Sequence, residues 1–83
     1  MLAEVEKIKR EVGKKYGVMP KEMDGPSREK RIVRARYEAI GRIRAETDCS
    51  LPEIGYYFGR REHTTILYAC RIYKKYPSRF SKG

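Results

Sequence analysis

Apolar positions recur every three or four residues along most of the chain, and this spacing predicts amphipathic helices rather than strands. The first helix is expected over residues 2–16, with Gly17 where a left-handed cap would end it. One further helical turn is expected within residues 18–23, where Pro20 suits a first turn. No internal repeat and no alternating strand pattern is present, so the sequence predicts a single all-α domain over residues 1–83.

A long basic helix is predicted over residues 28–47. A turn signal occupies residues 24–27, and Ser27 is the expected N-cap of the helix. The apolar stripe of this helix consists of Ile32, Ala35, Ala39, Ile40 and Ile43. Arginines take much of the remaining surface, so one side should pack on the core while the other carries positive charge.

Two shorter helices are predicted over residues 51–58 and 63–75, and a capping box of the form S-x-x-E begins at Ser50. Gly59 can adopt the positive φ that a tight turn needs, and Gly55 is small where the second helix must cross the first. Two helices joined in this way have the layout of a helix-turn-helix motif. A polar tail is expected to follow.

The outer face of residues 63–75 has chemistry suited to DNA. Its side chains are His63, Thr64, Leu67 or Tyr68, Arg71 and Lys74. Residues at the start of a recognition helix reach base edges, where threonine and histidine can form hydrogen bonds, and the cations would neutralise phosphates. The simpler alternatives are that the threonine pair only caps the helix and that the two helices only pack together.

Twenty lysines and arginines against eleven acidic residues give a formal net charge of +9 on 83 residues. This excess favours a polyanionic partner, either nucleic acid or an anionic membrane, over a merely solvated surface. The first helix mixes acids with bases on its polar face, which suits a membrane poorly, and no segment is apolar enough to span one. Double-stranded DNA is favoured over duplex RNA, whose deep, narrow groove does not admit a helix.

Catalysis is poorly supported, since the only histidine, His63, directly follows Glu62, and adjacent helical residues do not face each other. No nucleophile has a base at an evident spacing. Cys49 and Cys70 stand far apart without a C-x-x-C pattern, which indicates free thiols in a reducing cytoplasm. The sequence therefore predicts no enzyme, no metal and no cofactor.

The run from Ser50 to Arg71, SLPEIGYYFGRREHTTILYACR, closely resembles the signature of the C-terminal DNA-binding domain, domain IV, of the bacterial replication initiator DnaA. This signature is long and specific, and weaker similarity extends back to the first helix. The resemblance implies a helix-turn-helix on a small helical bundle related to the Trp repressor type. It also implies binding of short duplex sites of the DnaA-box kind, in control of replication initiation or of transcription.

The resemblance assigns roles to individual residues. The positions implied to contact bases are Glu62, His63 and Thr64 in the major groove, Thr65 beside them, and Arg28 in the minor groove. The positions implied to lie close to phosphates are Arg36, Arg44, Leu51 and Pro52. From their charge and place we add three further phosphate contacts, at Arg60, Arg61 and Arg71.

Three departures from the family pattern bear on the DNA site. Glu62 replaces an aspartate, Arg60 replaces a usual glycine, and Tyr37 replaces a glutamine. We expect affinity for duplex DNA to survive these changes, while the preferred site is left open.

The family's ATPase domain, with its G-x-x-x-x-G-K-[ST] phosphate-binding loop, is absent, so we expect a stand-alone relative or an excised domain. The alternative function is an adaptor or decoy that binds a replication protein, for which the seven tyrosines would suit an interface. In either case we expect a cytoplasmic protein.

Overall fold

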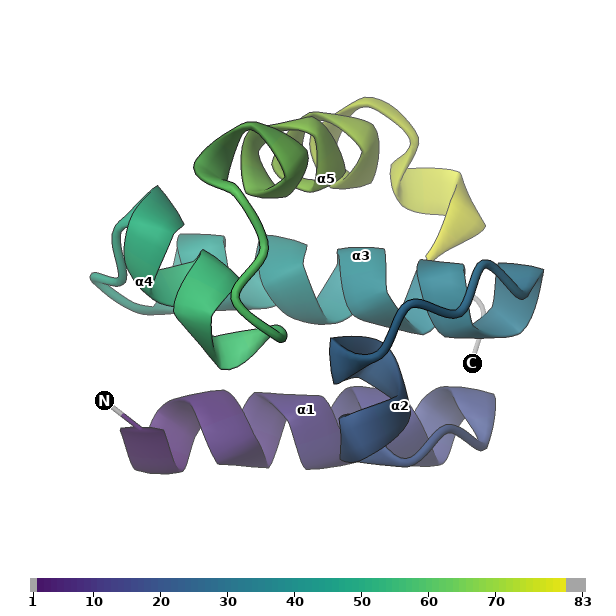
Figure 1. Cartoon of the computed structure of the whole chain (residues 1–83). Helices are drawn as coiled ribbons and strands as arrows, with labels where there is room; N and C mark the ends of the chain where they lie inside the picture. The colour runs from purple at the N-terminus through teal and green to yellow at the C-terminus, as the bar shows by residue number, and fades with distance from the viewer. Residues whose placement is uncertain (1, 81–83) are drawn as a thin grey trace.

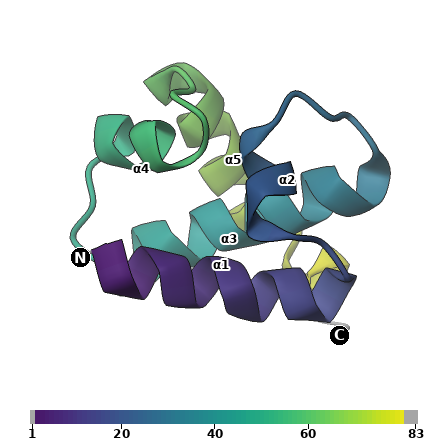
Figure 2. The ribbon, with the colours of Figure 1, turned by 60° about the horizontal axis from the view of Figure 1, so that its bottom comes forward.

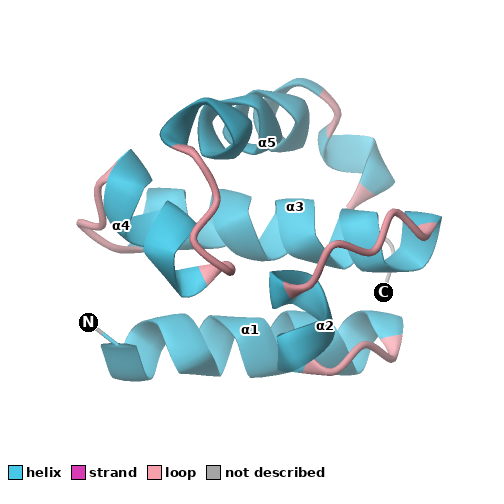
Figure 3. Cartoon of the chain, in the orientation of Figure 1, coloured by secondary structure: helices cyan, strands magenta, loops and turns pink. Residues whose placement is uncertain are grey.

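The computed structural model describes residues 2–80, which form five α-helices and one short 3₁₀ helix (Figure 1). In chain order these are α1 (Leu2–Tyr16), α2 (Pro20–Asp24), α3 (Lys30–Glu46), α4 (Leu51–Tyr57), α5 (His63–Lys75) and the 3₁₀ helix η1 (Pro77–Arg79). Short loops join them, and no strand occurs within the described residues (Figure 3). The predicted all-helical fold is confirmed.

The central helix is α3, which packs against α1 on one side and against α5 on the other (Figure 1). All five apolar residues predicted for its stripe are at most 4% exposed. The largest core side chains beyond α3 come from every other α-helix or its end, namely Val5, Val12, Met23, Ile54, Phe58 and Ile66. Burying each such side chain contributes roughly 1.5–3 kcal/mol, so this thin core holds all five α-helices together.

The start of α3 differs from the prediction. Its N-cap is Glu29, which makes no side-chain capping bond, so the prediction of Ser27 as N-cap was wrong. Instead, the Ser27 hydroxyl accepts from the amide of Glu29 within the loop, at 3.2 Å. The guanidinium of Arg36 donates to the carbonyls of Gly25 and Ser27, which keeps this stretch outside the helix. The loop therefore arches outward from the helical body before α3 begins (Figure 2).

The chain after α5 folds back instead of forming the expected polar tail. Phe80 is 5% exposed, and its ring centroid lies 5.3 Å from that of Tyr73. Lys15 of α1 donates to the carbonyl of Phe80, which ties the segment to the first helix. The tail prediction was wrong as far as Phe80 because one aromatic side chain finds a place in the core; residues 81–83 lie outside the described part.

Candidate nucleic-acid interface

The first helix of the predicted helix-turn-helix begins with the expected capping box. The Ser50 hydroxyl accepts from the amide of Glu53 at 3.3 Å, and the Ser50 amide donates to the Glu53 carboxylate at 2.8 Å. Hydrogen bonding of the carboxylate to Ser50, chiefly to its amide, favours the charged form and lowers the pKa of Glu53. The capping box therefore fixes where α4 begins. A separate hydrogen bond, from Arg44 in the last turn of α3 to the carbonyl of Cys49 at 3.0 Å, holds the chain just before α4 against α3.

The turn between α4 and α5 depends on close backbone approach. A Cβ at Gly55 would lie 2.2 Å from the carbonyl oxygen of Arg61, whose amide donates back to the Gly55 carbonyl. Gly55 is therefore needed because the backbone of the turn, rather than the second helix, packs directly against α4 at this position. Gly59 and Arg60 follow with φ of +79° and +61°, so two consecutive residues adopt the left-handed conformation. Glycine adopts a positive φ without steric cost, which explains why the family usually has glycine at the position of Arg60.

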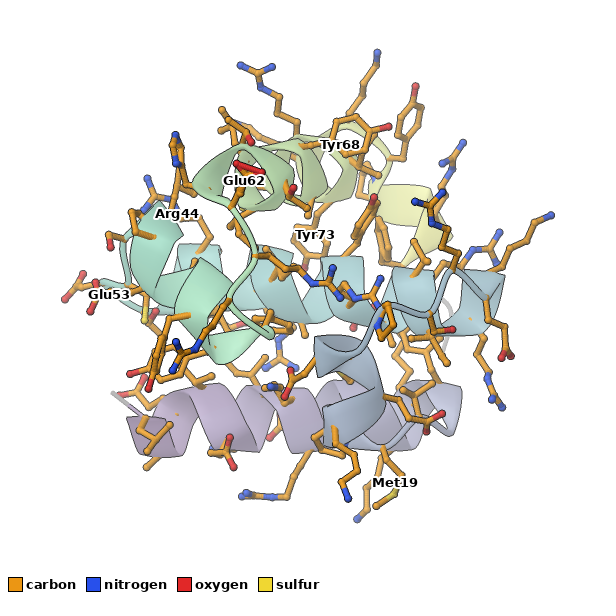
Figure 4. The ribbon with its side chains drawn as sticks, in the orientation of Figure 1. Met19, Arg44, Glu53, Glu62, Tyr68 and Tyr73 are labelled. Atoms are coloured by element: carbon orange, nitrogen blue, oxygen red, sulfur yellow. The ribbon has the colours of Figure 1, made fainter. Side chains whose placement is uncertain are left out.

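The outer face of α5 is exposed from its first residue. His63, Thr64 and Thr65 are all exposed, and the N-cap position belongs to Glu62, which makes no side-chain capping bond. Neither threonine is therefore the cap of this helix. Glu62 stands at the start of α5 and Tyr68 lies farther along its outer side (Figure 4).

Tyr68 rather than Leu67 belongs to this outer face, since Tyr68 is 56% exposed while Leu67 is half-buried. Its ring meets that of Tyr37 edge-on, with centroids 6.1 Å apart, which braces α5 against α3. The tyrosine that departs from the family pattern thus has a packing role beside the predicted reading helix.

Two arginines are turned inward and share the same acceptors. Arg36 is only 6% exposed and donates to the carbonyls of Met23, Gly25 and Ser27 at 2.8, 3.0 and 3.1 Å. Arg61 donates to the carbonyls of Met23 and Gly25 as well. Burial and the charge of Arg61 lower the pKa of Arg36. The turn before α5 is thereby bonded to the loop that carries Arg28.

A buried lysine bonds to the same part of the molecule. Lys9 of α1 is 3% exposed and donates to the carboxylate of Asp24 at 2.6 Å and to the carbonyl of Tyr57 at 2.8 Å. Its ammonium group also lies 4.5 Å from the ring centroid of Phe58. Lys9 therefore links α1, the end of α2 and the end of α4 at one point.

Comparison with known families agrees with this geometry. A family model described as the bacterial DnaA protein helix-turn-helix matches residues 5–72. The chain belongs to the bacterial DnaA helix-turn-helix family. The match covers all five α-helices in whole or in part and stops before η1.

The chain matches only a short stretch of each of its relatives in the DnaA family. It is 47% identical over 62 residues to the chromosomal replication initiator protein DnaA of Thermus thermophilus, covering 75% of this chain. It is 48% identical over 65 residues to the protein of the same name from Streptococcus pyogenes, covering 78% of this chain. The matched stretch is 14% of the length of each relative.

Most residues predicted to contact DNA in this DnaA-family domain are accessible. Besides the start of α5, the exposed ones are Arg28, Arg44, Pro52, Arg60 and Arg71, while Leu51 is half-buried. The structure does not bring Arg36 to this surface, because its guanidinium is occupied by loop carbonyls, and it leaves Arg61 half-buried. The inward role of both arginines was missed by the sequence analysis.

Membership of the DnaA helix-turn-helix family agrees with the expectation of a non-catalytic domain. Cys49 and Cys70 are free thiols, as expected, and burial raises the pKa of Cys70. Within residues 2–80, no group of three or more histidine, cysteine or carboxylate side chains is placed to hold a metal ion. No helix in that range is both long and apolar enough to cross a lipid bilayer.

Proposed function

We propose that this domain binds double-stranded DNA at sites of the DnaA-box kind, with the start of α5 in the major groove and Arg28 in the neighbouring minor groove. The observation that carries the proposal is the exposure of Glu62, His63, Thr64 and Thr65 at the start of a helix that none of their side chains caps. Polar groups placed there are free to meet base edges.

The surrounding cations suit the backbone of the same duplex. Arg44, Leu51 and Pro52 lie where the end of α3 meets the start of α4, while Arg60 lies in the turn before α5 and Arg71 in the second half of that helix. We assign the arginines to phosphate contacts by their charge and Leu51 by its free first-turn amide, whereas Pro52, which has no amide hydrogen, would lie against the backbone without donating to it. Arg61 lies beside this surface, but we do not count it as a phosphate donor, because its guanidinium and its amide are both bonded within the protein.

The biological output we propose is control of replication initiation in the bacterial cytoplasm, because the relatives are named chromosomal replication initiators. Control of transcription at the same sites is the second output to test. The matched stretch is 14% of the length of those proteins, so the proposal concerns the occupation of DNA sites by this domain and not their whole activity.

The deciding experiment is in vitro selection of bound sequences from random duplex DNA, followed by equilibrium binding of the selected site. The proposal expects a single enriched motif and affinity that falls steeply with salt. If random duplexes compete as well as the selected site, sequence-specific binding is ruled out. Binding of a replication protein without any DNA preference would instead identify an adaptor.

A further inference from the structure

A second cationic surface lies beside the predicted minor-groove arginine. A hollow of about 420 Å³ is lined in part by Arg28, Lys30, Arg34 and Arg79, together with Tyr37 and Phe80. None of the four cations forms an ion pair with a carboxylate of residues 2–80. Like charges gathered around one hollow repel one another, so the arrangement is favourable once an anion is bound there.

The position of Arg79 is fixed by the folded-back segment. Phe80 is buried against Tyr73, and Lys15, which holds the Phe80 carbonyl, is itself bonded to Glu38 at 2.8 Å. The guanidinium of Arg79 lies over the ring of Tyr76, 4.3 Å from its centroid. An exposed arginine would otherwise sample many rotamers, whereas here its head group is placed before any ligand arrives.

This segment lies outside the stretch that matches the DnaA family. The family match ends at residue 72, while η1 covers Pro77–Arg79. The contribution of Arg79 to the hollow is therefore a feature of this chain that membership of the family does not supply.

We propose that Arg79 binds a backbone phosphate of the duplex just beyond the minor groove that receives Arg28, so that η1 lengthens the DNA contact past the helix-turn-helix. This inference rests on the proposed function. The planar fork of an arginine matches two phosphate oxygens at once, and Lys30 and Arg34 add charge at the same edge. A contact of this kind adds affinity on any flanking sequence, because phosphates carry no base identity.

The test compares two duplexes that carry the same selected site. One ends at the base pair contacted by Arg28, and the other continues for several base pairs beyond it. Arg79→Ala should lower the log–log salt slope on the long duplex by about one unit, which is about an eightfold loss at 0.1 M salt if the curves meet at 1 M. On the short duplex wild type and variant should bind alike.

Two further variants make the result decisive. Lys7→Ala removes an exposed cation from α1, which lies across the molecule from α5, and should leave both salt slopes unchanged (Figure 1). Arg79→Lys should keep most of the slope, because one cation remains beside the same phosphate. An Arg79→Lys slope as low as that of Arg79→Ala would mean that the loss comes from altered structure, and the inference would fail.

The inference and the proposed function fail in different ways. Selective binding by wild type, with an Arg79→Ala slope equal to wild type on the long duplex, overturns the role of Arg79 alone. Absence of any duplex binding by wild type overturns both.

Discussion

Arg36 and Arg44 lie on the same helix and carry the same charge, yet their surroundings are opposite. Arg36 falls four residues after Ile32 and four before Ile40, so its Cα is on the apolar stripe of α3. Arg44 also falls four residues after Ile40, but no buried residue of α3 follows it, and it is exposed. The same spacing places Lys9 between Val5 and Val12 on α1, and it too is buried.

The helical spacing of the sequence therefore contained the signal for an inward-facing cation. It could not name the acceptors, because these carbonyls come from loops whose path depends on the folded chain. For such a residue, the helical spacing indicates that the side chain faces inward, and the tertiary structure is needed to identify its hydrogen-bond acceptors.

The two arginines should respond differently to truncation. Arg36→Ala leaves buried carbonyls short of a charged donor and should lower the free energy of unfolding by about 2–4 kcal/mol. Arg44→Ala should change it by less than about 1 kcal/mol and instead lower the salt slope of DNA binding by about one unit. Urea denaturation and a salt series of binding constants measure both effects. A fully stable Arg36→Ala variant would contradict the structural role assigned to that side chain.

The start of α5 should control selectivity more than stability. His63→Ala or Thr64→Ala removes an exposed side chain, so the free energy of unfolding should stay within about 0.5 kcal/mol of wild type. Discrimination at the contacted base pair should fall by roughly 1–3 kcal/mol. Binding to a panel of single-base variants of the selected site measures this, with Lys7→Ala as the control that keeps the full preference. An unchanged preference in both variants would remove these residues from base recognition.

At the scale of elements, local signals located most helix ends well. The capping box set the start of α4, and α5 runs from His63 to Lys75 as expected. Errors arose where distant contacts outweigh local ones: Arg36 draws the loop before α3 away from the Ser27 cap, and Phe80 draws the tail into the core. Neither contact has a local signature, since both join residues separated along the chain.

The turn between α4 and α5 offers a test of backbone strain. Arg60 has φ of +61°, a conformation that costs an L-residue roughly 1–2 kcal/mol. Both Arg60→Gly and Arg60→Ala remove the guanidinium. The glycine variant should relieve the backbone strain, whereas the alanine variant should retain it. The glycine variant should therefore be more stable than the alanine variant by about 1 kcal/mol in thermal or urea unfolding. Equal stability of the two variants would show that the turn relaxes to another conformation.

At the scale of the whole molecule, not all of the cations behind the net charge of +9 lie on the surface. Lys9 and Arg36 are buried and Arg61 is half-buried, so these cations serve the fold, while those around α5 and the hollow beside Arg28 face solvent. Composition alone favoured a polyanionic partner, but it could not say how much of the charge is available to such a partner.

Salt should act on folding and on binding in opposite directions. Raising NaCl from about 50 to about 500 mM screens the repulsion among exposed cations, and the thermal midpoint of the free domain should rise by a few degrees. Over the same range the affinity for duplex DNA should fall by orders of magnitude. Circular dichroism melts and fluorescence anisotropy measure the two trends. A midpoint that falls with salt would indicate that ion pairs such as Lys9 with Asp24 outweigh the repulsion.

The bond from Arg61 to the loop of Gly25 has a consequence for the DNA itself. Because the turn before His63 and the loop carrying Arg28 are bonded to each other, the protein sets the separation between its two proposed points of DNA entry. A duplex must then supply the matching groove spacing by its own twist and minor-groove width. If DNA enters at these two points, base pairs between them should influence affinity through their deformability even where no side chain contacts them, and flexible pyrimidine–purine steps should be enriched there.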